Sequence, residues 1–219
     1  RPAREAMGET AHHPRWAIAY KFDSPLAESV VREIDVQIGR TGRATPVARI
    51  DPTPVGGTTV SNITLHNQSY IDALDLDCGD RVSISRRGDV IPAVERVLEK
   101  AGSGRWTMPE ACPVCRQLLK IDGAHHFCVN WDCPARQLGR LQFFVARDQL
   151  DIDGFGPETI GVLRDRGLLS DLPDLYALDW ESILALDGFG RKRIELMQAG
   201  LAASRTRPYR RVLAALGIP

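Results

Sequence analysis

Four of the five cysteines occur in two short segments, Cys112-Pro-Val-Cys115 and Cys128-Val-Asn-Trp-Asp-Cys133. Two residues separate the first pair of cysteines, four separate the second, and twelve lie between the pairs. Two short loops can therefore place four thiolates at the corners of a tetrahedron, which is the geometry of a structural zinc site. Four protein ligands leave no position for water, so we expect a zinc ion that holds the fold and takes no part in catalysis. An iron-sulfur cluster and unligated thiols are the alternatives.

The composition excludes several classes of protein. Lys and Arg together number 28 and so do Asp and Glu, so the net charge is zero and any nucleic-acid footprint must be local. No apolar run has the roughly 18 residues that a membrane span needs, and no signal-peptide core opens the chain. The fifth cysteine, Cys78, stands alone. We expect a protein of a reducing, cytoplasmic compartment with no membrane partner and with one to three modules.

Short apolar alternations precede the cysteines. Ile34, Val36 and Ile38 alternate, and strand patterns follow at 47–50, 55–65 and 81–91 with Gly and Pro between them. About 70 residues in about five strands predict an all-β, OB-type barrel. Further upstream, residues 16–22 alternate bulky and small side chains, which predicts a strand with Lys21 on its open face. Such a lysine either stands beside a bound ligand or is an edge-strand lysine in solvent.

Helical periodicity follows the cysteines. We expect a helix over 137–146 and then two helical pairs that contain a repeat, Ile152-Asp-Gly-Phe-Gly-Pro-Glu-Thr-Ile160 against Leu186-Asp-Gly-Phe-Gly-Arg-Lys-Arg-Ile194. Each Asp-Gly-Phe-Gly precedes a helix start, which predicts helix-hairpin-helix motifs in an all-α region. Glycines let the backbone approach a phosphate, and helix N-terminal amides face the anion. An ordinary glycine-closed turn is the alternative. The glycines concerned are Gly154, Gly156, Gly188 and Gly190.

Basic residues are concentrated near the second hairpin. Arg191, Lys192 and Arg193 open the predicted helix, and more arginines follow between 205 and 211. A solvated helix face is the common explanation of such a run, but a neighbouring phosphate-binding loop favours a nucleic-acid contact. In the barrel, Arg40, Arg86 and Arg87 lie at glycine breaks, where they either reach a ligand or are ordinary surface charges. No nucleophile with its base, no P-loop and no catalytic carboxylate pair is recognisable, so we expect no catalysis by this chain alone.

Several segments taken in order resemble bacterial NAD-dependent DNA ligases. They are RWAIAYKF at 15–22, VQIGRTGRATPVA at 36–48, VSNITLHN at 60–67, RRGDVIP at 86–92, the four cysteines, and LDIDGFG at 150–156. The resemblance implies the last segment of a nucleotidyltransferase (adenylation) domain at 1–26, an OB fold at 27–104, a tetracysteine zinc finger at 105–137 and part of a helix-hairpin-helix domain at 138–219.

The resemblance also implies a function. Enzymes of this family use NAD and Mg²⁺ to seal nicks in duplex DNA through an AMP intermediate, in replication and repair. It implies that Lys21 contacts the adenylate phosphate and that the hairpin glycines, with Arg191 and Lys192, meet phosphates of nicked DNA. The barrel residues expected at the nick are Arg40, Arg86, Arg87, Val90 and Ile91. The expected location is the bacterial nucleoid.

The same resemblance predicts what is missing. We expect the family's adenylated lysine, in its Lys-x-Asp-Gly motif, to be absent, together with the NAD-recognising domain, a BRCT domain and a second hairpin pair after residue 219. The chain would then need an N-terminal ligase half, in cis or in trans. A freestanding, non-catalytic protein that binds nicked or structured DNA is the alternative, and an RNA-binding zinc module is a third hypothesis.

Overall fold

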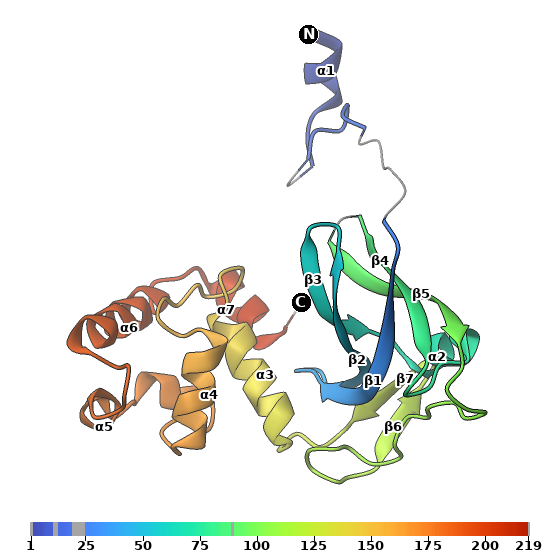
Figure 1. Cartoon of the computed structure of the whole chain (residues 1–219). Coiled ribbons are helices and arrows are strands. Elements are labelled where there is room, and N and C mark those ends of the chain that lie inside the picture. Colours follow the sequence, from blue (N-terminus) through green and yellow to red (C-terminus); the bar gives the residue numbers. More distant parts are fainter. Residues whose placement is uncertain (1, 11–12, 19–24, 89, 219) are drawn as a thin grey trace. The chain divides into compact units, whose positions relative to one another are not determined.

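A computed structural model of the chain describes residues 2–10, 13–18, 25–88 and 90–218 (Figure 1). The chain divides into two compact units. The first contains Arg1–Glu33, Ala48–Thr64 and Asp77–Gly104, and the second contains Ile34–Val47, Leu65–Leu76 and Arg105–Pro219. Strands β1 (Ala27–Ile38) and β2 (Arg43–Val55) therefore run through both units.

The strands form one antiparallel, OB-like sheet with the order β5-β4-β1-β2-β7-β6, and β3 pairs with β2. The remaining strands are β3 (Thr58–Thr64), β4 (Arg81–Arg87), β5 (Ile91–Glu99), β6 (Leu119–Asp122) and β7 (His125–Cys128). In the first unit β4 pairs with β1 from Ala27↔Ile84 to Val30↔Arg81, and with β5 from Arg81↔Glu99 to Arg87↔Ile91. The sheet and the four-cysteine group agree with the predicted barrel and metal-binding module.

The expectation that residues 30–100 contain only strands was wrong in one place. Helix α2 (Gln68–Leu74) lies between β3 and β4. The Asn67 side chain caps it by accepting a hydrogen bond from the Tyr70 backbone N–H at 2.9 Å, and Ile71 is its buried residue. A helix of seven residues is too short for the helical period to register in the sequence. The runs expected at 55–65 and 81–91 are each interrupted by turns, at Gly56-Gly57 and at residue 88.

The first residues differ from their prediction where they are described. Helix α1 (Pro2–Met7) opens the chain. A strand was expected from Trp16 to residue 22, but Trp16 lies in a turn and residues 17 and 18 belong to no strand. The rest of that expected strand, including Lys21, lies outside the described residues, so its proposed contact with an adenylate stays a prediction.

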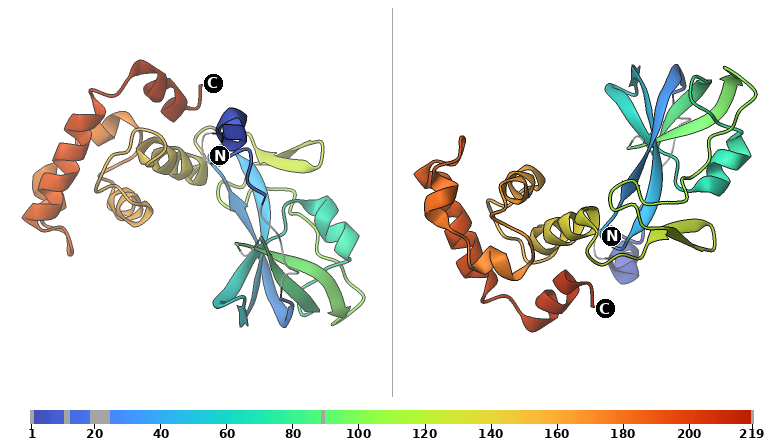
Figure 2. Two further views of the ribbon diagram at one scale, coloured as in Figure 1. Left: turned by 90° about the horizontal axis from the view of Figure 1, so that it is seen from above. Right: turned by 90° about the horizontal axis from the view of Figure 1, so that it is seen from below.

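The helices of the second unit are α3 (Pro134–Val145), α4 (Pro157–Asp165), the 3₁₀ turn η1 (Pro173–Tyr176), α5 (Trp180–Leu184), α6 (Arg191–Ser204) and α7 (Tyr209–Leu216). They enclose one apolar core that includes Leu141, Ile160, Leu163 and Met197. The ribbon of β6 and β7 leads directly into α3, as the yellow-green and yellow segments of Figure 2 show. Over the described ranges, no helix is long and apolar enough to cross a membrane.

Candidate metal centre and nucleic-acid interface

The four predicted cysteines converge as the spacing requires. The sulfur atoms of Cys112, Cys115, Cys128 and Cys133 all lie within 4.8 Å of one another. The Cys112 and Cys133 Sγ atoms are 4.0 Å apart, and those of Cys115 and Cys128 are 3.5 Å apart. A tetrahedral site with Zn–S bonds of about 2.3 Å places its sulfurs about 3.8 Å apart. The residues therefore fit a four-coordinate metal ion with sulfur ligands.

Each pair of cysteines is held by its local backbone. In the first loop, the N–H of Arg116 donates to Cys112 O, and Arg116 adopts a left-handed conformation with φ 64°. In the second, Cys133 donates its N–H to Asn130 O and then forms the N-cap of α3, with Pro134 in the first turn. The second pair is thus fixed to the start of a helix.

The acidity of the thiols differs across the group. A backbone hydrogen bond from Gln117 lowers the pKa of Cys115 to about 6. Burial raises the pKa of Cys128 and of Cys133, because a thiolate loses its hydration there. Without a metal, the two buried groups are therefore thiols at neutral pH. A bound metal ion would supply the positive charge that lets all four ionise.

The ribbon that carries Cys128 pairs with the barrel hairpin. Strand β7 pairs with β2 at Arg43↔Phe127 and Ala44↔His126, and the Cys128 N–H donates to Gly42 O at 2.7 Å. Gly42 is buried with φ 86°, and a Cβ there would overlap the carbonyl oxygen of Cys128. Only glycine fits this contact.

A buried arginine, Arg136, binds the same carbonyl oxygen of Cys128 that lies against Gly42. Arg136 is 5% exposed, and its Nη1 donates to the carbonyl oxygens of Cys128 at 3.0 Å and Asn130 at 3.1 Å. Its guanidinium also lies 4.4 Å from the ring centroid of Trp131. Arg136 was not among the residues predicted for the site. The only signal was its position three residues after a cysteine, on the first turn of a helix.

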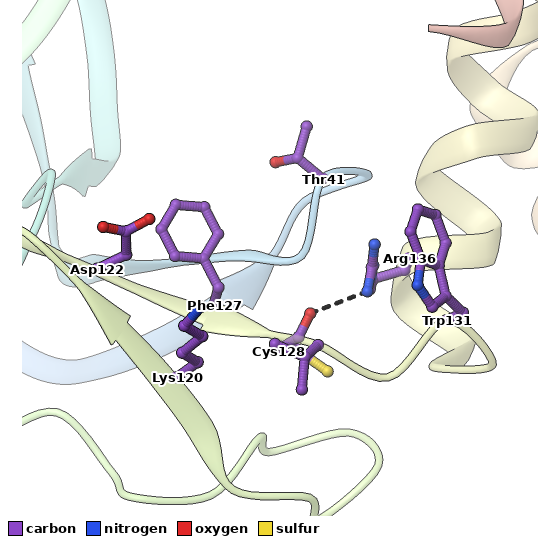
Figure 3. Close-up of a pocket in the computed structure, with 8 residues that line it drawn as sticks. Thr41, Lys120, Asp122, Phe127, Cys128, Trp131 and Arg136 are labelled. Carbon is purple, nitrogen blue, oxygen red and sulfur yellow. Dashed lines mark hydrogen bonds between the residues drawn. The ribbon is translucent and has the colours of Figure 1, made fainter.

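A hollow of about 280 Å³ lies beside the four-cysteine group, with Cys128 in its lining (Figure 3). It is lined by Thr41, Lys120, Asp122, Phe127, Cys128, Val129, Trp131 and Arg136. The dashed line in Figure 3 marks the hydrogen bond from Arg136 to the Cys128 carbonyl. Trp131 is 68% exposed, so one wall of the hollow is an accessible aromatic ring.

The expected absence of the tetrapeptide pattern Lys-x-Asp-Gly needs a correction. Lys120-Ile121-Asp122-Gly123 has this spacing. Its first three residues belong to β6 and Gly123 makes the turn into β7, with Lys120 exposed and opposite Phe127. An exposed lysine on a ribbon lacks the burial in an apolar pocket that can activate an amine nucleophile. We therefore interpret this match as part of the cysteine ribbon.

The two predicted hairpins have the same backbone geometry. Gly154 and Gly188 have φ 86° and 82°, while Gly156 and Gly190 are extended N-caps with φ −70° and −76°. Helices α4 and α6 begin at the expected residues, directly after these caps. A Cβ at Gly156 or at Gly190 would meet no atom within 4 Å, so both glycines face open space. Each hairpin therefore presents a bare helix N-terminus that an anion can approach.

Gly154 has a second role that the repeat does not reveal. A Cβ at this position would lie 2.5 Å from Met197 Cγ and 3.2 Å from Met197 Cα. One turn further along α6, a Cβ at Gly200 would lie 2.8 Å from Asp153 O. The first hairpin thus packs closely on the helix that follows the second hairpin. Gly154 is needed for this packing whether or not it also approaches a phosphate.

The basic residues after the second hairpin divide into two groups. Arg191 and Lys192 are exposed on the first turn of α6, as the predicted phosphate contact requires. Arg207 instead binds the Asp151 carboxylate at 3.1 Å, and the guanidinium of Arg205 stacks on Tyr176 at 4.9 Å. Part of the arginine run therefore supports the fold of the helical region.

The barrel residues predicted at the nick lie near the β4–β5 turn. Arg86 donates from Nη1 to Gly56 O at 2.7 Å, and it shares a hollow of about 260 Å³ with Val90 and the first residues of β3. Val90 and Ile91 are 71% and 55% exposed. Arg87 is ion-paired with Glu95 at 3.1 Å, which offsets its charge. These contacts with DNA stay predictions.

The fifth predicted barrel residue, Arg40, contacts α3. The Arg40 guanidinium lies 3.7 Å from the ring centroid of Phe143. A guanidinium over an aromatic ring is held by a cation–π interaction, which does not use its N–H groups as hydrogen-bond donors to oxygen. Arg40 and Phe143 both belong to the second unit, and the helix that contacts Arg40 begins at Cys133, a member of the four-cysteine group.

Comparison with known proteins agrees with this geometry. Residues 28–105 match the family model described as the NAD-dependent DNA ligase OB-fold domain. The chain is 49% identical over 220 residues to a protein named DNA ligase from Halorubrum lacusprofundi, covering all of this chain and 31% of that protein. It is 43% identical to a DNA ligase from Borrelia duttonii and 42% to one from Leptospira biflexa, in each case over 98% of the chain and 32% of the relative. The chain spans about a third of the length of these curated relatives.

Proposed function

We propose that this chain, which belongs to the NAD-dependent DNA ligase family, forms the part of such an enzyme that binds the duplex around a nick. The whole enzyme would seal the nick through an AMP intermediate, with NAD and Mg²⁺, in replication and repair. The adenylated lysine would lie in the two thirds of the family's length that this chain does not span. The expected setting is the cytoplasm, on the nucleoid.

The observation that carries the proposal is the paired hairpin. Two loops with matching backbone conformations end in N-caps with open space around them, and exposed Arg191 and Lys192 follow the second. Backbone amides at helix N-termini bind phosphate without reading the base sequence. Two such sites in one rigid core would hold two points of a duplex backbone. A ligase needs this property, because nicks occur in any sequence.

The barrel supports the same proposal. Arg86 shares a hollow with exposed Val90, and exposed Ile91 follows Val90 in the chain, so a charged donor and apolar side chains lie at the same turn. The donor would bind a phosphate, and the apolar pair would pack on a sugar or an unstacked base at the nick. Lys21, which would touch the adenylate phosphate, belongs to the same proposal by resemblance.

The metal centre completes the proposed assembly as a structural element. Four sulfur ligands suit Zn²⁺, and they leave no coordination position for a substrate. The two cysteine loops have few apolar residues of their own, so the ion would hold them together. We therefore assign zinc to the fold of the DNA-binding surface and no step of the sealing reaction to it.

A binding experiment tests the proposal. Affinities for nicked duplex, intact duplex and single-stranded RNA are compared at several matched salt concentrations, because phosphate contacts weaken as salt rises. We expect nicked duplex to bind most tightly, with a salt dependence that decreases in Arg191→Ala and Lys192→Ala. Glu158→Gln, which changes a charge at the first hairpin without removing a cation, is the control. Tighter binding of single-stranded RNA would contradict the proposal.

A further inference from the structure

One face of α3 holds the turn between β1 and β2. Arg136, Gly139 and Phe143 are spaced by three and four residues and therefore lie on the same side of the helix. Arg136 hydrogen-bonds the Cys128 carbonyl that faces Gly42. Phe143 lies under the Arg40 guanidinium at 3.7 Å. The three positions thus meet both ends of the turn 39–42.

At Gly139 the backbone of α3 lies very close to the backbone of Arg40. A Cβ there would lie 3.0 Å from the Arg40 backbone nitrogen, 3.1 Å from its Cα and 3.2 Å from its Cβ. Two of those atoms are backbone, so a side chain at position 139 could be accepted only if the turn moved. The hairpin therefore rests against the bare backbone of α3.

The metal centre fixes the same helix at its start. Cys133 is both a predicted ligand and the N-cap of α3, and Arg136 follows one turn later. Cys128 is also a predicted ligand, and its backbone N–H bonds Gly42. One predicted ligand, Cys128, is thus bonded directly to the turn that carries Arg40, and another, Cys133, caps the helix that contacts this turn through Gly139.

We propose that α3 holds Arg40 in the position from which it contacts DNA, and that the tetracysteine centre fixes the position of this helix relative to the turn 39–42. The metal centre would then influence DNA affinity at a distance, through Gly139 and Phe143, without touching DNA. Gly42, Arg136, Gly139 and Phe143 become positioning residues for the barrel's contact with DNA. This inference rests on the proposed DNA-binding function, and its test separates the two.

The test uses the whole, metal-loaded chain and a matched pair of substitutions. Gly139→Ala places a methyl group against the Arg40 backbone, whereas Gly161→Ala, also inside a helix, meets no atom within 4 Å. Both changes improve helix propensity. We expect Gly139→Ala alone to keep its metal content, to accelerate amide hydrogen exchange in residues 36–44, and to weaken binding of nicked duplex. The expected loss is about tenfold, the effect of one charge-assisted hydrogen bond.

A second set of variants tests the route through Arg40. Arg40→Ala should weaken binding about as much as Gly139→Ala, and the double variant should be no weaker than either single variant. Phe143→Leu should also weaken binding, because it removes the ring that contacts Arg40. Phe143→Tyr keeps this ring and should bind DNA as tightly as the unchanged protein. Removal of the metal with a chelator should accelerate exchange in the same residues 36–44.

The outcomes distinguish the inference from the proposed function. Unchanged exchange in residues 36–44 in both Gly139→Ala and the chelated protein would overturn the positioning role. Additive losses in the double variant would overturn the route through Arg40. Faster exchange in Gly139→Ala, with DNA affinity unchanged in Arg40→Ala, would support positioning of the turn while contradicting the contact of Arg40 with DNA.

Discussion

Arg193 Nη2 donates a hydrogen bond of 2.8 Å to Thr159 Oγ1. The two residues occupy the same position in the two copies of the repeat, 34 residues apart. Thr159 is buried in α4, and the Arg193 guanidinium also stacks on Phe189 at 4.1 Å and bonds Gly188 O at 2.9 Å. One side chain therefore ties the second hairpin to the helix that follows the first. The two candidate phosphate sites are held as a pair.

This bond predicts a measurable coupling. Arg193→Met and Thr159→Val should each lower the free energy of unfolding, and the double variant should lose about 1 kcal/mol less than the sum of the single losses. Denaturant unfolding of the four proteins gives the cycle. Independent, additive losses would show that the contact does not join the hairpins.

The glycines of the hairpins should separate binding from stability. Gly156→Ala and Gly190→Ala add a methyl group in open space, so we expect weaker DNA binding with little change in thermal stability. Gly154→Ala should instead destabilise by about 2 kcal/mol, because its φ is 86° and its Cβ meets Met197. Calorimetry and duplex titration on the same samples distinguish the two effects. Equal destabilisation by all three changes would refute this assignment.

Metal binding should release protons. Burial raises the pKa of Cys128 and Cys133, so both are protonated at neutral pH until a metal ion binds, and acid should therefore weaken metal affinity. Titration calorimetry with Zn²⁺ in buffers of different ionisation enthalpy measures the release. Cys128→Ser should lower the metal content, and Cys78→Ser, which is exposed and outside the cluster, is the control. Heat that is independent of the buffer would contradict the prediction.

The Arg87–Glu95 pair predicts a pH-dependent contribution to stability. The Arg87 hydrogen bond, and then that of Ser85, lowers the pKa of Glu95 below its usual 4.5. The stabilisation is therefore complete above the unfolded pKa and is lost as the pH falls through the lower folded pKa. Glu95→Gln should be less stable at pH 7 and should lack this part of the acid dependence. Thermal unfolding between pH 7 and pH 3 measures it, and parallel curves for the two proteins would argue against the pair.

Local patterns predicted those features whose cause is local. The cysteine spacing gave a converging ligand group, and the Asp-Gly-Phe-Gly repeats gave the starts of α4 and α6, because ligand loops and helix caps depend on a few neighbouring residues. Helix α2 escaped prediction because its cap, Asn67, precedes only seven helical residues. The expectation that the chain lacks the pattern Lys-x-Asp-Gly overlooked Lys120-Ile-Asp-Gly123, which the structure places on the strand β6 and the turn after it.

Contacts between distant residues could not be predicted from the sequence. In the sequence, Gly42 resembles an ordinary turn glycine. The structure shows that it is required because the carbonyl of Cys128, 86 residues later, packs against it. The sequence predicts that Gly154 lets a phosphate approach the backbone, but it does not show that Met197 packs against this glycine. The sequence around Arg87 does not show that β5 brings the Glu95 carboxylate within 3.1 Å of its guanidinium. In each case the deciding partner lies on another element, so only the folded chain reveals it.

The most direct test of the account combines this chain with a separately produced N-terminal ligase portion, NAD, Mg²⁺ and a nicked duplex, and measures sealing. We predict sealing only when both portions are present, and no effect of Lys120→Ala. Binding of nicked DNA without sealing in the mixture would favour a freestanding DNA-binding protein. Sealing by this chain alone would contradict the account, and its loss in Lys120→Ala would identify the ribbon lysine as the nucleophile.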